Sequence, residues 1–173
     1  MSDDFAHDLR LDQLRDGDRI DLTANDNECA AIAERLGLDG LDRLEAHAVL
    51  TCGKESVRAQ GRLGAALTQA CVVTGDPVAA HVDAPFDILF MRDPGSTGHD
   101  EEIELGAEDC DVVFHDGATI DLGSAIADTL ALSIDPYPRS AGAEATLKEA
   151  GVMTEEQASP FAVLARLKGG GET

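Results

Sequence analysis

Hydrophobic and polar residues alternate along the middle of the chain, and this alternation predicts β-strands. Between residues 44 and 50, every second position is apolar: Leu44, Ala46, Ala48 and Leu50. A longer alternating run extends from Val57 to Cys71, and a third extends from Val78 to Phe90 after a turn at residues 74–77. Successive side chains of a strand point to opposite faces, so each run buries one face. The second and third runs predict a long antiparallel hairpin.

Two other segments have the spacing of helices. From Asp26 to Leu36 the apolar side chains share one face, and Asn25 or Asp26 can cap the first turn while Gly37 ends the last. This pattern predicts a helix over residues 26–36.

The second predicted helix extends from Leu122 to about Leu132, with Asp121 as its N-cap. The prolines of the segment Asp135-Pro-Tyr-Pro138 end it, because proline lacks a backbone donor and restricts the residue before it. Shorter strands are expected near residues 8–11, 19–23 and 110–114. Together these elements predict an α+β fold, in which two or three helices pack on a strongly curved antiparallel sheet or a partly open barrel.

The chain is expected to form one domain over residues 1–139, which contains an exposed, flexible acidic loop at about residues 93–109. An Ala-, Gly- and Glu-rich linker is expected over residues 140–158. A short helix is expected over residues 159–168, where Phe161, Leu164 and Leu167 have helical spacing. A helix this short is marginal in isolation, so we expect it to dock on its own domain or on a partner.

Length and composition are those of a globular protein. The chain has 173 residues, of which 43% are hydrophobic, and this is enough for one ordinary core. No stretch approaches the roughly 20 apolar residues of a membrane span, and the first residues lack the pattern of a secretory signal, so we expect a cytoplasmic protein without membrane contact. The 4 cysteines are far apart in the sequence, which favours reduced thiols over a disulfide framework.

Acidic residues dominate the charge. The formal net charge is -21, from 34 Asp and Glu against 13 Lys and Arg, and such a surface repels nucleic-acid phosphates. An alternative interpretation is that the acidic surface only keeps the protein soluble. From Asp93 to Pro138, however, the chain has no Lys or Arg, and we expect that such a segment can hold a basic partner. Four loop carboxylates are candidates for this contact: Asp100, Glu101, Glu102 and Glu104. They lack the order of a calcium-binding loop, which favours a solvated face over a cation cage.

Cys71 is the residue most open to a chemical interpretation. Its position in register with a buried strand face favours a small hydrophobic core residue over a reactive thiol. Structural zinc sites supply paired cysteines two to four residues apart, and no such pair is present. A catalytic thiol with His81 or His47 as base requires the fold to bring them together. No nucleotide-binding or hydrolase motif occurs, and no cofactor is expected.

Two further groups carry alternative interpretations. Arg58 and Arg62 lie on the polar side of a predicted strand, where a solvated face is favoured over a small basic patch. The segment containing Tyr137 and Arg139 is fixed by its prolines, and such a segment serves equally well as a structural turn or as a recognition element.

Several of these segments, taken in order, resemble the bacterial YceD family, the large ribosomal RNA subunit accumulation proteins. The similar segments are Cys71-Val-Val-Thr-Gly-Asp-Pro-Val78 before the strand to Phe90, Ile120-Asp-Leu-Gly123 before a helix, Asp135-Pro-Tyr-Pro-Arg139, and the tail at residues 159–168. The residues of this chain that carry the resemblance are Cys71, Pro77, Asp121, Leu122, Asp135 and Pro136. Many members of the family have a second cysteine where this chain has Thr74, and this departure argues against a metal role here.

The resemblance implies a role in ribosome biogenesis and attaches no catalytic residue to the chain. We therefore expect a non-enzymatic factor whose acidic surface at residues 93–138 binds a basic ribosomal protein or a pre-ribosomal particle. The first alternative is a factor that contacts ribosomal RNA directly through Arg58, Arg62 and Arg139. The second alternative, a zinc-dependent enzyme, is less favoured.

Overall fold

The computed structural model describes residues 5–93, 95 and 110–152. Its contacts divide the chain into two compact units. The main unit comprises residues 1–69 and 79–136, and the second unit comprises residues 70–78 and 137–173. Both are discontinuous in sequence.

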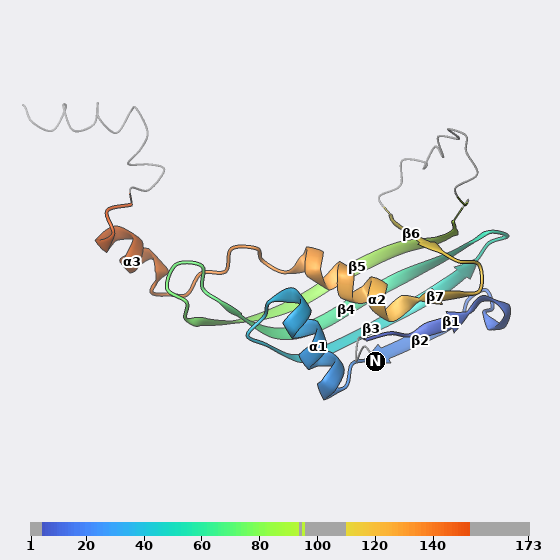
Figure 1. The fold of residues 1–173 in the computed structure, drawn as a ribbon, viewed down its shortest axis with the longest axis horizontal. Helices are drawn as coiled ribbons and strands as arrows, with labels where there is room; N and C mark the ends of the chain where they lie inside the picture. The colour runs from blue at the N-terminus through green and yellow to red at the C-terminus, as the bar shows by residue number, and fades with distance from the viewer. Residues whose placement is uncertain (1–4, 94, 96–109, 153–173) are drawn as a thin grey trace, which may run out of the picture. The chain divides into compact units, whose positions relative to one another are not determined.

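A five-stranded sheet forms the centre of the main unit (Figure 1). Its strands, in spatial order, are β2 (Arg19–Thr23), β3 (Gly40–Cys52), β4 (Ser56–Ala70), β5 (Pro77–Arg92) and β6 (Asp111–His115). The pairs β2–β3 and β3–β4 are antiparallel. The predicted hairpin is present as β4 and β5, which run in opposite directions, since Arg58 meets Asp87 and Arg62 meets Asp83.

The sheet is mixed, whereas the sequence pattern predicted a purely antiparallel one. Strand β6 pairs in parallel with β5, with Ile88 opposite Asp111 and Arg92 opposite His115. A parallel pair needs a crossover connection of about a dozen residues or more. Residues 93–110 supply that length, and we expected residues 93–109 to be only an exposed loop.

A second, two-stranded sheet joins distant parts of the chain. Strand β1 (Asp8–Arg10), which is followed by the 3-10 helix η1 (Leu11–Gln13), pairs with β7 (Thr119–Asp121). In the described part of the chain, β2 and β6 are the edges of the five-stranded sheet. The sheet is therefore not closed into the barrel that we considered.

Both helices predicted in the main unit are confirmed. Helix α1 (Asp26–Leu36) begins with a capping box, in which the Asn25 side chain accepts the Glu28 N–H and the Glu28 carboxylate accepts the Asn25 N–H. It ends at Gly37, whose φ of 65° is left-handed. Helix α2 (Leu122–Ser133) begins after Asp121.

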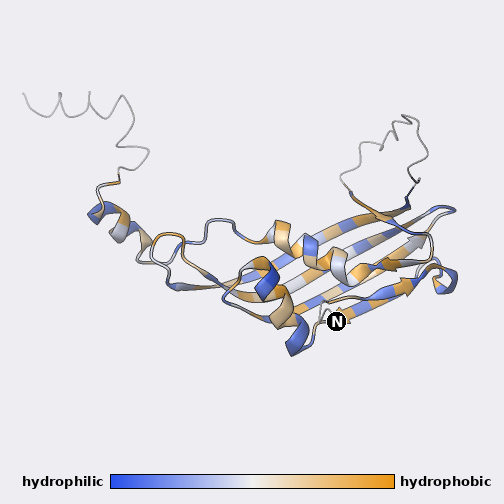
Figure 2. Cartoon of the chain, viewed as in Figure 1, coloured by the Kyte–Doolittle hydropathy of each residue, from blue (hydrophilic) through white to orange (hydrophobic). Residues whose placement is uncertain are grey.

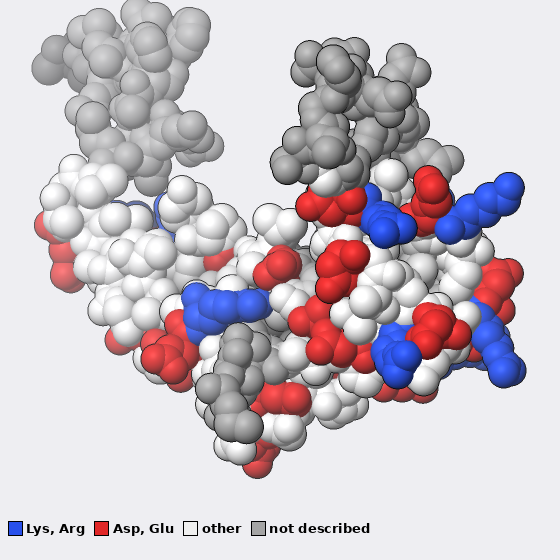
Figure 3. All heavy atoms as spheres, turned by 45° about the vertical axis from the view of Figure 1, so that its right-hand side comes forward, with Lys and Arg blue, Asp and Glu red and all other residues white. Residues whose placement is uncertain are grey.

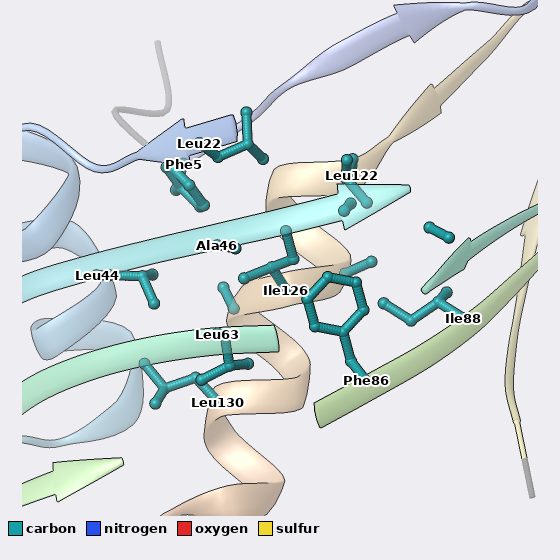
Figure 4. Close-up of a cluster of buried hydrophobic side chains, with 14 of the residues drawn as sticks. Phe5, Leu22, Leu44, Ala46, Leu63, Phe86, Ile88, Leu122, Ile126 and Leu130 are labelled. Carbon is teal, nitrogen blue, oxygen red and sulfur yellow. The ribbon is translucent and has the colours of Figure 1, made fainter. Parts of the chain in front are cut away.

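Helices α1 and α2 cover one face of the five-stranded sheet, and the core lies between this face and the helices (Figure 1). Leu122, Ile126 and Leu130 of α2 are completely buried. Figure 4 shows them facing Phe86 and Ile88 of β5 together with side chains of β3 and β4. Along the strands, polar and apolar residues alternate as expected for a sheet that buries one face (Figure 2).

The second unit contains the turn at residues 71–76 and helix α3 (Ala143–Glu149). This helix lies within residues 140–158, which we expected to be a linker. The helix expected at residues 159–168 lies outside the described residues, as does most of the expected acidic loop. None of the described helices is long and apolar enough to cross a membrane.

Candidate functional site

The outward face of β4 carries two arginines, and each of them meets a carboxylate on β5. Arg58 binds Asp87 through two hydrogen bonds, from Nε to Oδ1 at 2.7 Å and from Nη2 to Oδ2 at 2.6 Å. Arg62 donates from Nη2 to Asp83 Oδ1 at 2.8 Å. The hydrogen bonds from Arg58, together with one from Gln60, lower the pKa of Asp87 against the opposing effect of burial.

These pairs change the interpretation of Arg58 and Arg62. A guanidinium that already holds a carboxylate in two hydrogen bonds has fewer donors left for a phosphate, and its charge is neutralised. The Arg58–Asp87 pair is also partly buried, so its geometry is better protected from water than that of the exposed Arg62–Asp83 pair. Arg58 and Arg62 therefore each connect two neighbouring strands, and each has a carboxylate beside its guanidinium.

Cys71 lies just after β4, where the chain has left the sheet. Its side chain is 3% exposed but does not belong to the main hydrophobic core. The Sγ atom accepts the backbone N–H of Thr74 at 3.5 Å and that of Ser140 at 3.2 Å. The two hydroxyl groups of Thr74 and Ser140 are 3.1 Å apart and share a hydrogen bond. We call Cys71, Thr74 and Ser140 the Cys71 cluster.

The Cys71 cluster favours a thiolate. Hydrogen bonds from Ser140 and Thr74 lower the pKa of Cys71 to about 6, although burial acts in the opposite direction. The expectation of a small apolar core residue is therefore correct about burial and wrong about the surroundings. Thr74 was visible in the sequence as the position of a second cysteine in related proteins, but nothing in the sequence pointed to Ser140.

The metal-site and catalytic interpretations of Cys71 each require partner side chains. Among the described residues, no three His, Cys, Asp or Glu side chains form a metal-binding group. His47, one of the two bases considered for a catalytic pair, is hydrogen-bonded through Nδ1 to Asp21 Oδ1 at 2.6 Å on the β2–β3 surface. His81 is exposed on β5.

The family-motif residues around Asp121 hold the N-terminal segment against α2. Asp121 Oδ1 accepts the backbone N–H of Ser124, which caps the helix, and also that of His7, each at 2.9 Å. The Leu122 N–H in turn donates to the His7 carbonyl at 3.1 Å. A side chain at Gly123 would collide with the Phe5 carbonyl oxygen. These motif residues thus have a structural role, and Leu122 is in the core.

The segment at residues 135–139 has both structural contacts and exposed side chains. The carbonyl of Asp135 accepts a hydrogen bond from the Gln69 side chain at 2.9 Å, within the main unit. The carbonyl of Pro138 accepts the Val72 N–H at 3.0 Å, within the second unit. Tyr137 is 71% exposed, and Pro136 and Arg139 are also exposed. Both interpretations of this segment, structural turn and recognition element, remain compatible with these contacts.

Several acidic residues of the 93–138 stretch also have local roles. Asp116 Oδ1 accepts the backbone N–H groups of Ala118 and Thr119, which lower the pKa of this carboxyl. Asp128 on α2 pairs with Arg35 on α1 at 3.4 Å. Four partner-binding candidates lie outside the described residues: Asp100, Glu101, Glu102 and Glu104. Their role stays a prediction.

Comparison with known protein families shows what the chain is similar to. The model of the family described as large ribosomal RNA subunit accumulation protein YceD matches residues 59–168. This range includes most of β4, together with β5, the Cys71 cluster, α2 and the segment at residues 135–139. No curated protein and no solved structure matches the chain.

Proposed function

Because the chain belongs to the YceD family, we propose that it is a non-enzymatic factor that supports accumulation of large-subunit ribosomal RNA by binding a basic ribosomal protein or a pre-ribosomal particle. The description of the family gives the process, and the charge of the chain suggests the partner. A net charge of -21 attracts a basic protein at long range and repels free nucleic acid.

The pairing of Arg58 and Arg62 is the observation that carries the choice of a protein partner over RNA. Direct contact with RNA through these residues would require guanidinium groups that are free to bind phosphates. Both are held by their own carboxylates, Asp87 and Asp83. The RNA-contacting alternative thus loses two of its three arginines and keeps only Arg139.

The contact is proposed to centre on the acidic residues at 100–104, with Tyr137 and Arg139 as further candidates. Carboxylate density is highest there, with four acids in five positions. Electrostatic attraction of this kind raises the association rate and falls with ionic strength, because salt screens exposed charges within about 10 Å at 0.1 M.

The test is a pull-down with the tagged full-length chain at low and moderate salt, with and without nuclease, in which protein and RNA are both identified. We expect a basic large-subunit protein that survives nuclease treatment and is lost as salt rises. Recovery that depends on intact ribosomal RNA would instead support direct RNA contact. Retention that is unchanged at high salt would remove the electrostatic basis of the proposal.

A matched pair of variants separates a local contact from overall charge. The first variant neutralises the four loop acids: Asp100→Asn, Glu101→Gln, Glu102→Gln and Glu104→Gln. The second removes the same charge from four exposed acids elsewhere: Asp39→Asn, Asp42→Asn, Glu144→Gln and Glu149→Gln. We expect the first variant to lose most of the recovered protein and the second to keep most of it. Equal losses would mean that no particular surface is used.

A further inference from the structure

An open groove lies at one end of the main unit. It is bounded by the turn between β3 and β4, the ends of β5 and β6, and the region of η1, and its volume is about 430 Å³. Leu11, Leu14 and Val57 supply the apolar part of a lining that also contains charged and polar side chains. This volume is within the range of about 300–1,000 Å³ that is usual for small-molecule sites.

Two cations from different elements lie on the rim of this groove, Lys54 in the β3–β4 turn and Arg92 at the end of β5. Both are exposed. In contrast to Arg58 and Arg62, neither has an ion pair or a side-chain hydrogen bond with any residue in the described ranges 5–93, 95 and 110–152. In Figure 3 the end of the main unit that carries the groove comes forward, and Lys and Arg side chains lie there among acidic ones.

Arg92 lies against the turn that follows β6. A methyl group placed on Gly117 would come within 3.1 Å of Arg92 Nε and 3.4 Å of its Cζ, so the guanidinium lies close to the backbone of this turn. Gly117 also has a φ of 95°, which a residue with a side chain rarely adopts. The Asp93 N–H donates to the His115 carbonyl at 3.0 Å and joins the two strand ends.

His115 adds a third donor. Its Nδ1 accepts the N–H of Gly117 at 2.9 Å, so this nitrogen carries no proton. In the neutral ring the proton therefore lies on Nε2, which is available as a donor. The groove thus combines a guanidinium, an ammonium and an imidazole N–H. Glu55, next to Lys54, is the one acid among the residues that line it.

This set of donors suits a compact anion with several oxygens. Guanidinium and ammonium groups are the usual partners of phosphate, and several donors can bind its oxygens together. A chain with a net charge of -21 repels an extended polyanion, but salt confines that repulsion to roughly 8 Å at physiological ionic strength. A small ligand can carry its negative charge in one group on a less polar body. Such a ligand is attracted by the donors of the groove and stays clear of most of the acidic surface.

We propose that this groove binds a phosphate group of a nucleotide-sized ligand, with Lys54, Arg92 and His115 as its donors and the leucines beneath the body of the ligand. The phosphate belongs either to a free nucleotide or to the terminal nucleotide of an RNA strand. The donors proposed here are different residues from the loop carboxylates that the protein-partner proposal uses.

In the first experiment, the full-length chain is titrated with each probe at low salt, and binding is monitored by amide NMR and by calorimetry. The probes are adenosine monophosphate, adenosine, and a short single-stranded RNA with either a 5′-phosphate or a 5′-hydroxyl. We expect adenosine monophosphate to shift amides near residues 52–57 and 115–118 and adenosine to shift them far less. If the phosphorylated RNA binds more tightly than both the mononucleotide and the hydroxyl RNA, the source is an RNA end; if only the mononucleotide binds, it is a free nucleotide. Equal binding of adenosine and its monophosphate, or no binding of any probe, would overturn the proposal.

Variants then test the residues. Lys54→Gln and Arg92→Gln should each raise the Kd about tenfold or more, because each removes a charged hydrogen-bond donor. Glu55→Gln should lower the Kd, because it removes the nearby negative charge. Lys148→Gln, which removes the same charge from exposed α3, is the control and should change little. If Lys148→Gln weakens binding as much as Lys54→Gln does, the groove is not the site.

Discussion

At the scale of single residues, the Cys71 cluster makes the clearest prediction. Because Ser140 is the largest cause of the lowered pKa of Cys71, Ser140→Ala should raise this pKa from about 6 toward the usual value near 9. The rise should be partial, since the backbone N–H of residue 140 remains. Titration of the cysteine ¹³Cβ resonances by NMR measures the change, with Cys71→Ser for assignment. An unchanged pKa in Ser140→Ala would show that the hydroxyl does not act on the thiolate.

The same shift links Cys71 to stability. A thiol whose pKa is lower in the folded state contributes stability that is complete above its unfolded pKa, near 9, and is lost as the pH falls through about 6. The free energy of unfolding should therefore increase between pH 6 and pH 9 more in the parent chain than in Cys71→Ala. Urea denaturation at a series of pH values measures it. An identical pH dependence in both chains would contradict the prediction.

The contribution of His47 to stability should change with pH in the opposite direction. Its hydrogen bond to Asp21 raises the pKa of His47 above the usual 6.5. Its contribution to stability is complete below pH 6.5 and is lost as the pH rises through the raised value. Asp21→Asn should lower the pKa of His47, which NMR titration of the ring protons measures. Because both partners are mostly exposed, the effect on stability should be small.

The sequence predicted the faces of single residues better than their partners. Alternation alone placed Arg58 and Arg62 on a polar strand face and Cys71 on a buried one. The ion pairs, however, depend on the register between β4 and β5, which no local pattern gives. Ser140 is distant from Cys71 in sequence, so its approach to the thiol is a consequence of the fold rather than of spacing.

At the scale of elements, the N-terminus of α2 should depend on Asp121 more than an ordinary cap does. Its Oδ1 accepts two backbone N–H groups, one from the helix and one from His7. Loss of an N-cap alone costs about 0.5–2 kcal/mol. Asp121→Ala should therefore lower the free energy of unfolding by about 2 kcal/mol, because the His7 N–H also loses its acceptor. Urea denaturation followed by circular dichroism measures this loss.

Asp121→Asn is the matched control for that prediction, because the amide oxygen still accepts both N–H groups while the negative charge is lost. It should cost clearly less than Asp121→Ala, since asparagine is as good an N-cap as aspartate. Equal costs for the two substitutions would mean that the charge at the helix terminus, and not the two hydrogen bonds, is what Asp121 supplies.

Elements defined by their own residues were predictable, and elements defined by distant pairing were not. Helix α1 was predicted to its residue limits because its apolar face lies within it and its cap and terminal glycine directly flank it. Strand β7 has three residues and exists through its pairing with β1. The parallel pairing of β6 depends on the path of residues 93–110. Helix α3 has seven residues without an apolar stripe, so its composition resembled a linker.

At the scale of the whole molecule, the excess of acidic over basic residues is the dominant property. Each of Asp83, Asp87 and Asp128 meets an arginine, but these pairs use few of the 34 acids. The excess negative charge repels itself in the folded chain, and its members are farther apart when the chain unfolds. Self-repulsion of this kind destabilises the compact state and is weakened by salt.

Sodium chloride should therefore stabilise the protein. Between low salt and about 0.5 M, screening of a net charge of -21 should outweigh the weakening of the few exposed ion pairs, which contribute about 0–1 kcal/mol each. A gain of about 1 kcal/mol corresponds to about 2–4 °C in Tm for a chain of this size. Thermal unfolding at several salt concentrations measures this change in Tm.

The variant with Asp39→Asn, Asp42→Asn, Glu144→Gln and Glu149→Gln has less charge repulsion, so its Tm should start higher and rise less with salt. A Tm that falls with salt, or an equal rise in both chains, would mean that specific ion pairs rather than net charge govern the electrostatic part of stability.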